Sequence, residues 1–261
     1  MIKHYFFLAC FLLLVPDLKA DLQPHRAYYT LALAGRPSPQ SPLVDVRGTL
    51  LIELSKAETG WTLQHLSKLS LYYVDGTVEH VRDGYVTFEA YDGNLFKFHT
   101  YRRVDDAPVE TISKGVAKKK GETLEVTYTQ PTKKTLVLPE GALFPLQYRQ
   151  ALLKAASEGE KMFPRLVFDG RNLEGASETN TFMSAQRVGE SGHQLAGQAF
   201  WPMRSAIYSP KTTYYEPMCT TTQDLFATGI TGPYVTDCMM GDMKIHGTLD
   251  RVELLQEAEK K

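Results

Sequence analysis

Residues 61–103 read WTLQHLSKLSLYYVDGTVEHVRDGYVTFEAYDGNLFKFHTYRR, and this stretch decides the fold class. Its apolar and aromatic residues recur in the β-rich, period-two runs that indicate half-buried strands. Three aspartate–glycine pairs, at Asp75-Gly76, Asp83-Gly84 and Asp92-Gly93, divide the stretch. Such pairs are typical of tight hairpin turns, because these turns need residues at positive φ. The predicted antiparallel strands are Trp61–Val74, Thr77–Arg82, Tyr85–Tyr91 and Leu95–Arg103.

The same pattern continues on both sides of this meander. Turns every 8–12 residues favour an antiparallel barrel or sandwich. No stretch alternates strands with helices of βαβ length, so a doubly wound nucleotide-binding fold is disfavoured. The further predicted strands are His25–Ala34, Asp45–Leu54, Val109–Lys118, Thr123–Thr129, Thr135–Leu138, Lys161–Asp169, Thr179–Gly189, Gln198–Tyr208, Thr213–Thr228 and Tyr234–Leu255.

One segment has a helical composition. Leu146–Ser157 is rich in alanine, leucine and other good helix formers. Pro145 precedes it, where a helix tolerates proline, and Gly159 follows it as a C-terminal cap. We expect this helix to link two β halves, with a Gly- and Ser-rich loop at Gly189–Gly197 in the second half.

The composition and net charge of the chain exclude some classes of function. The chain has 261 residues, 43% of them hydrophobic and 23% charged, which is ordinary for a globular protein of one large β domain or two small ones. A chain this long needs neither metals nor disulfides to fold. Its formal net charge of −1 implies no strongly basic face, so we expect no nucleic-acid partner.

The first twenty residues predict a secretory signal peptide. Lys3 and His4 form a positive head, and the eleven residues Tyr5–Val15 carry no charge. Ala20 offers a small cleavage residue, so the mature chain would begin at residue 21. Eleven residues are too few to span a bilayer as a helix, and no later segment is long enough, so no transmembrane segment is expected after cleavage. A retained anchor, or a lipid attached at Cys10, are the alternatives.

Cys219 and Cys238 form the strongest local signal. They are placed symmetrically about Thr228-Gly229. If Ala227–Ile230 is a hairpin turn, the two cysteines face each other with Cα atoms about 4.5 Å apart, inside disulfide range. A disulfide there would contribute roughly 3 kcal/mol. Two buried thiols are the alternative.

No residue pattern supports catalysis, a cofactor or a metal site. The seven histidines lack the spacing of zinc ligands. Gly189-Glu190-Ser191-Gly192-His193 has histidine where a hydrolase nucleophile elbow needs glycine. Gly170–Gly175 has the glycine spacing of a phosphate loop but lacks its lysine. We therefore expect a protein that is not an enzyme, and a hydrolase using Ser191 is the least favoured hypothesis.

An ordered set of short matches runs through almost the whole mature chain. It resembles the bacterial cell-envelope integrity protein EipB family. The matching residues are Pro24–Leu31, Gly48, Phe96-Lys97-Phe98, Gly115-Val116-Ala117, Lys134-Thr135-Leu136, Leu143-Phe144-Pro145, Val167–Gly170, Phe200-Trp201-Pro202, Gly241-Asp242 and Gly247-Thr248-Leu249.

This resemblance implies a periplasmic, mainly β protein with no known catalytic activity. Its fold would be an antiparallel β-spiral, an open barrel of two interlocking half-shells with a linking central helix. The expected organisation is a signal peptide at 1–20, an N-terminal half-shell at 21–145, a helix at 146–159, a C-terminal half-shell at 160–256 and a charged tail at 257–261.

The sequence departs from the family at its cysteines. Family members typically join a cysteine in an early Ser-x-Cys-Glu-Gly stretch to one near the C-terminus. Here Ser55–Trp61 and Leu249–Leu255 contain no cysteine, so that bond cannot form. A bond between Cys219 and Cys238 would lie within one half instead.

Two functional hypotheses remain from the residues and the resemblance. The first is a periplasmic interaction or scaffold module that supports envelope integrity through exposed strand edges or the concave sheet, with an envelope or periplasmic protein partner. The second is a carrier that shelters lipid or lipoprotein acyl chains on an apolar concave face, with the helix Leu146–Ser157 as a lid.

Overall fold

The computed structural model describes residues 22–35, 41–190, 194–210, 216–238 and 243–256. Within these ranges the chain forms one helix and fifteen strands, which belong to a single antiparallel sheet. The predicted signal peptide at 1–20, with Cys10, and the predicted tail at 257–261 lie outside the described residues. No helix in the described ranges is long and apolar enough to cross a membrane.

The first half of the chain is a meander in which each strand pairs with the next. Three of its strands run for 13 to 15 residues, and none of the three contains a proline that would interrupt the pairing. The strands are β1 (His25–Leu33), β2 (Leu43–Ala57), β3 (Gly60–Tyr73), β4 (Val78–Ala90), β5 (Leu95–Val104), β6 (Glu110–Lys120), β7 (Thr123–Gln130) and β8 (Lys134–Val137).

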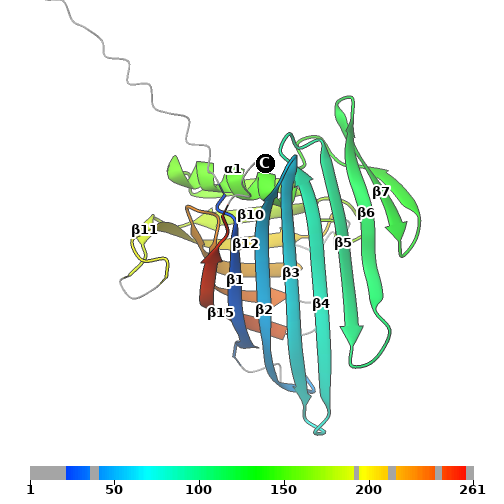
Figure 1. The fold of residues 1–261 in the computed structure, drawn as a ribbon, viewed down its shortest axis with the longest axis vertical. Coiled ribbons are helices and arrows are strands. Elements are labelled where there is room, and N and C mark those ends of the chain that lie inside the picture. The colour runs from blue at the N-terminus through cyan, green and yellow to red at the C-terminus, as the bar shows by residue number, and fades with distance from the viewer. Residues whose placement is uncertain (1–21, 36–40, 191–193, 211–215, 239–242, 257–261) are drawn as a thin grey trace, which may run out of the picture.

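The second half begins with the helix and returns to the first strand. Its elements are α1 (Pro145–Ser157), β9 (Met162–Val167), β10 (Ser177–Met183), β11 (Arg187–Val188), β12 (Ala199–Tyr208), β13 (Cys219–Phe226), β14 (Thr231–Cys238) and β15 (Met243–Leu254). β15 pairs with β1, so β1 lies between β2 and β15 and joins the two halves into one sheet (Figure 1).

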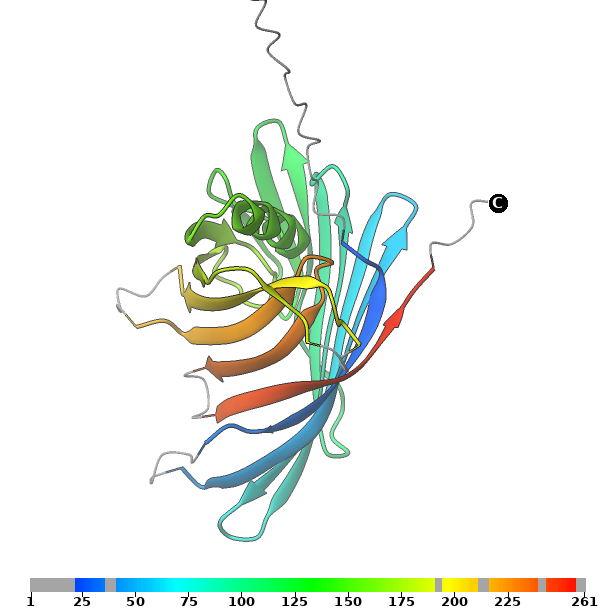
Figure 2. The same ribbon diagram turned by 90° about the vertical axis from the view of Figure 1, so that its left-hand side faces the viewer.

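The sheet curls until its two ends approach each other, but no strand pairing closes it. Its terminal strands are β8 and β9. α1 lies between the two halves at one end of the curled sheet (Figure 2). The structure therefore confirms the expected fold class, a mainly β open barrel with one central helix.

The helix forms where the sequence predicts it. Pro145 occupies the first turn, and Gly159 follows the C-cap residue Glu158 with φ of 86°, a value that favours glycine. Its buried side chains, among them Leu146, Leu152 and Leu153, pack against Trp61 and Trp201 of the two halves. The apolar face of α1 thus fills the space between the halves.

A second cluster of buried aromatic rings lies beside the N-terminal end of α1. Phe96 stacks on Phe144 with ring centroids 4.8 Å apart, and Phe168 meets Phe98 edge-on at 5.6 Å. These rings come from β5, from the start of the helix and from the segment after β9. Their packing brings the two ends of the sheet together.

The predicted turn at Asp83-Gly84 is wrong, because β4 runs straight through it. Gly84 faces the ring of Tyr101 across the β4–β5 pair, and a Cβ at this position would lie 2.1 Å from a ring atom. The glycine therefore makes room for an aromatic neighbour within a strand. A sequence reading cannot distinguish this role from a turn without knowing the register.

Two long predicted strands are each divided into two strands in the structure. Thr179–Gly189 is interrupted after Met183, where β10 ends before the short β11. Tyr234–Leu255 is divided because β14 ends at Cys238 and β15 begins at Met243. The apolar and β-branched residues that predict these runs do not mark where one strand ends and the next begins.

Candidate functional site

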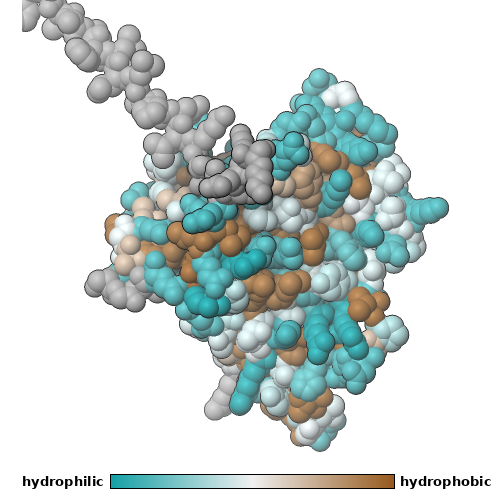
Figure 3. All heavy atoms as spheres, viewed as in Figure 1, coloured by the Kyte–Doolittle hydropathy of each residue, from teal (hydrophilic) through white to brown (hydrophobic). Residues whose placement is uncertain are grey.

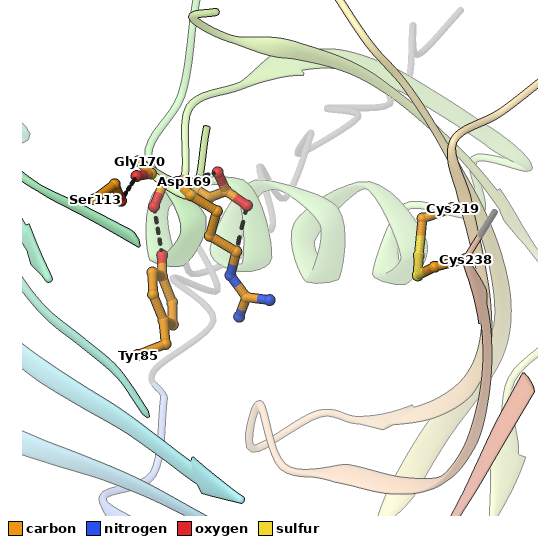
Figure 4. A network of polar contacts seen from close by, with 7 residues as sticks. Tyr85, Ser113, Asp169, Gly170, Cys219 and Cys238 are labelled. Atoms are coloured by element: carbon orange, nitrogen blue, oxygen red, sulfur yellow. Dashed lines mark hydrogen bonds and ion pairs between the residues drawn. A yellow bond between two sulfur atoms is a disulfide. The ribbon is translucent and has the colours of Figure 1, made fainter. Parts of the chain in front are cut away.

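The two ends of the sheet are joined at a seam, which we define as residues 168–173, directly after β9. The hydroxyl groups of Tyr85 and Ser113 donate to the carbonyl oxygens of Asp169 and Gly170, the first over 2.8 Å (Figure 4). Tyr128 Oη donates to the carbonyl of Asn172 over 2.8 Å. Side chains of β4, β6 and β7 thus hold the seam through its backbone, where strand pairing is absent.

The seam has a turn conformation that its own residues stabilise. The backbone N–H of Arg171 donates to Asp169 Oδ1 over 2.9 Å, and the Arg171 guanidinium lies over the Tyr85 ring, 4.2 Å from its centroid. Gly170 adopts φ of 72°, and a Cβ there would lie 2.4 Å from the Phe98 ring. The glycine at 170 is therefore required both by the backbone and by the space.

A buried carboxyl group ties α1 to the sheet. Glu89 of β4 is 3% exposed and accepts hydrogen bonds from the backbone N–H groups of Leu146 and Gln147, over 2.9 and 2.8 Å. These are free donors of the first helical turn, which carries no acidic residue of its own. Burial raises the pKa of Glu89 to about 7 although both hydrogen bonds act to lower it.

Arg149 of α1 has a guanidinium group that forms no ion pair with a carboxylate in the described part of the chain. Arg149 Nη1 donates to the carbonyl of Gly229 over 2.7 Å and to Thr231 Oγ1 over 3.1 Å. Burial lowers the pKa of Arg149 and lowers that of the neighbouring His25 to about 4. His25 is therefore neutral at pH 7, and its Nδ1 lies 2.7 Å from the carbonyl of Gln23.

The space beside Arg149 is small. It is a cavity of about 10 Å³ lined by residues of β1, β2, β3, α1 and the start of β14, among them His25, Tyr29, Leu54 and Leu63. That volume holds about one water molecule. An acyl chain cannot enter this part of the shell unless α1 moves away.

The wall of the shell that is formed by β10, β12, β13 and β14 carries hydroxyl groups and the disulfide. Tyr148 Oη of α1 lies 2.6 Å from Thr181 Oγ1, which lies 2.6 Å from Ser205 Oγ. Cys219 and Cys238 are bonded across β13 and β14, with Cα atoms 4.1 Å apart, as the symmetry about Thr228-Gly229 predicts. Figure 4 shows this bond on the wall opposite Tyr85.

The described residues contain no group of three metal-ligating side chains and no complete catalytic triad. Ser70 Oγ lies 3.0 Å from His80 Nδ1 on the outer face, but within the described ranges no carboxylate is hydrogen-bonded to that imidazole ring. A nucleophile and a base without an orienting group do not make a triad. Ser191 and His193 lie outside the described residues.

Comparison with known proteins places the whole shell in a family. A family model described as EipB-like matches residues 17–256. The chain belongs to the EipB-like family. A curated relative, the cell envelope integrity protein EipB of Brucella abortus (strain 2308), is 24% identical over 248 residues, which cover 92% of this chain and 87% of the relative.

A solved structure shows the same fold. The crystal structure of a beta-barrel-like protein of a domain of unknown function from Brucella abortus superimposes with a TM-score of 0.81 at 23% identity. The match covers 90% of this chain and 99% of that chain. The two chains therefore share one fold over almost the whole length of the solved structure.

The seam, Glu89 and Arg149 were not singled out by sequence reasoning. Gly170 was considered only as a member of a glycine-spaced loop, and its contact with Phe98 spans 72 positions of sequence. Glu89 and Arg149 reach partners 57 and 80 positions away. No local pattern marks such contacts, because burial and register create them.

Proposed function

We propose that the protein supports cell-envelope integrity as a non-enzymatic periplasmic scaffold that binds its partner on the outside of a filled shell. Membership of the EipB-like family and the name of the Brucella relative support the envelope role. The observation that carries the scaffold role is the filled interior beneath α1, where the cavity beside Arg149 measures about 10 Å³.

The strand edges offer little to a partner. β9 has Pro164 at its centre, which has no N–H to donate. Further along the same edge, the carbonyl of Leu166 and the N–H of Phe168 are already bonded to Leu143, over 2.9 Å each. β8 is four residues long. Both free edges are therefore poor templates for an added strand, and a partner would contact a face of the sheet.

A lipid-carrier function is the second candidate. It is favoured by inward-facing apolar side chains that remain partly exposed away from α1, such as Leu50, Leu69 and Ile245. An acyl chain bound against them would gain about 0.8 kcal/mol for each buried CH₂ group. A lipid that co-purifies with the protein would favour the carrier over the scaffold.

Deletion and complementation in the bacterium that encodes the chain test the envelope role. We expect the deletion strain to be more sensitive to detergent, and the wild-type gene to restore resistance. The double variant Tyr85→Phe with Ser113→Ala removes two hydroxyl groups that hold the seam. It should complement less well than the control Tyr208→Phe with Thr222→Val, which removes two hydroxyl groups from outward positions of β12 and β13.

Protein abundance is measured by immunoblot in every strain. A deletion strain with an unchanged detergent sensitivity would contradict the envelope role. If both double variants complement equally well at equal abundance, the hydrogen bonds that hold the seam are not needed for the envelope role.

A further inference from the structure

The outer face of β3–β6 carries charge of one sign. Side chains alternate along a strand, and Leu63, Tyr85 and Phe98 mark the buried, inward positions. The outward positions of these four strands carry seven basic residues and no carboxylate. We call them the basic face: Lys68, Arg82, Lys97, Arg103, Lys114, Lys118 and Lys120.

The carboxylates of the same strands all occupy the other set of positions. There are four of them, and each shares its face with an inward residue: Glu79, Asp83, Glu89 and Glu110. The basic face is therefore a property of the register and not of the composition. A chain with a net charge of −1 thus has a strongly asymmetric surface, which the net charge did not predict.

The register places the cations side by side. Lys68, Arg82 and Arg103 are direct neighbours across β3, β4 and β5. Like charges directly opposite each other destabilise a sheet, so this arrangement costs stability unless an anion covers it. Three of the seven have a carboxylate nearby, since Arg103 lies 3.7 Å from Asp106, Lys120 lies 2.5 Å from Glu125, and Lys118 is directly opposite Glu125 across β6 and β7.

The other four, Lys68, Arg82, Lys97 and Lys114, form no ion pair with any described residue. Lys68 and Arg82 also line a groove of about 340 Å³ on this face, together with Arg47, Thr49 and His80. Partly exposed apolar and aromatic residues such as Leu66, Val86 and Tyr101 lie between the cations. Figure 3, which views the same side as Figure 1, shows hydrophilic and hydrophobic side chains interspersed over these strands.

We propose that the basic face docks on an anionic phospholipid surface. Its cations are spread in two dimensions: Lys68, Arg82 and Arg103 lie on neighbouring strands about 5 Å apart, and Lys97 lies six residues, about 20 Å, from Arg103 along β5. A layer of phosphate groups can meet cations that are spread over such an area, whereas a single small anion cannot. The apolar side chains between them suit the boundary between headgroups and acyl chains. The proposal rests on the proposed periplasmic location, because the periplasm is bounded by two membranes. It adds a membrane contact to the scaffold function.

Vesicle co-sedimentation of the mature chain tests the proposal. We expect binding to vesicles with 30% phosphatidylglycerol in phosphatidylcholine, no binding to pure phosphatidylcholine, and loss of binding at high salt, because charge screening shortens the interaction range. The variant Lys68→Gln, Arg82→Gln, Lys114→Gln should bind about 150-fold more weakly. That factor corresponds to about 1 kcal/mol for each basic residue removed.

The control variant is Arg187→Gln, Arg204→Gln, Lys244→Gln, which removes the same charge from exposed positions of the second half. It should bind anionic vesicles as the wild type does. Equal loss in both variants, or equal binding to neutral vesicles, would overturn the proposal. Binding of soluble polyphosphate without any binding to vesicles would overturn it as well. Failure of vesicle binding with an intact deletion phenotype would refute the docking face and leave the envelope role standing.

Discussion

Replacement of Glu89 by glutamine tests how the helix is held. In the folded protein burial raises the pKa of Glu89 to about 7, whereas the ordinary value is 4.5. The folded state therefore holds this proton more tightly than the unfolded state. The contribution of the group to stability is fully present below pH 4.5 and is lost as the pH rises to about 7. At 1.36 kcal/mol per pH unit, the loss is about 3 kcal/mol.

Glutamine has the shape of the protonated side chain and does not ionise, but its amide nitrogen donates and cannot accept one of the two N–H bonds that Glu89 accepts. We therefore expect Glu89→Gln to be less stable than the wild type by about 1–3 kcal/mol at pH 4.5, and the difference to move by about 3 kcal/mol in favour of the variant between pH 4.5 and pH 8. Urea unfolding followed by tryptophan fluorescence, with the disulfide intact, measures the difference at each pH. Trp61 and Trp201 both contact the core beneath α1 and report on it.

A matched control is Glu178→Gln, which changes an exposed carboxylate of β10. This variant should unfold with a free energy close to that of the wild type at both pH values. The reasoning is refuted if the stability difference between Glu89→Gln and the wild type is the same at pH 4.5 and at pH 8. That result would mean that the bonds to the N–H groups of Leu146 and Gln147 fully offset the cost of burying the charge.

Three further substitutions have defined outcomes. Replacing Cys219 and Cys238 by serine should lower the free energy of unfolding by about 3 kcal/mol, measured by urea unfolding, and an unchanged midpoint would argue against a stabilising bond. Tyr85→Phe leaves the carbonyl of Asp169 without its donor and should cost about 1–3 kcal/mol, with faster hydrogen exchange in the seam and unchanged exchange in β13 as the control. Gly170→Ala places a methyl group against the Phe98 ring at positive φ and should lower the melting temperature by several degrees, whereas a wild-type melting curve would contradict the packing.

Local signals predicted a large part of the fold. The period-two runs located the strands of the meander, and the composition of Leu146–Ser157 with its flanking proline and glycine located the helix. The Cys219–Cys238 pairing followed from a hairpin, whose geometry depends on neighbouring residues alone. These features are encoded within about twenty residues of sequence, so a single sequence is sufficient to find them.

The candidate site depends on long-range contacts, which a single sequence does not reveal. Asp83-Gly84 was mistaken for a turn because its reason, the ring of Tyr101, lies on the next strand. The sequence does not identify Glu89 as a partner of α1, because 57 positions separate it from Leu146. The basic face was hidden by a balanced net charge, since only the register decides on which side of the sheet each charge lies.

The native mass of the protein purified from the periplasm without reductant tests the central claim most directly. The account predicts a polypeptide that begins at residue 21, is two hydrogens lighter than the reduced chain, and carries no bound lipid. Gas-phase unfolding should release nothing from it. A co-purifying mass of lipid size that leaves on unfolding would contradict the filled shell and make the carrier the leading function.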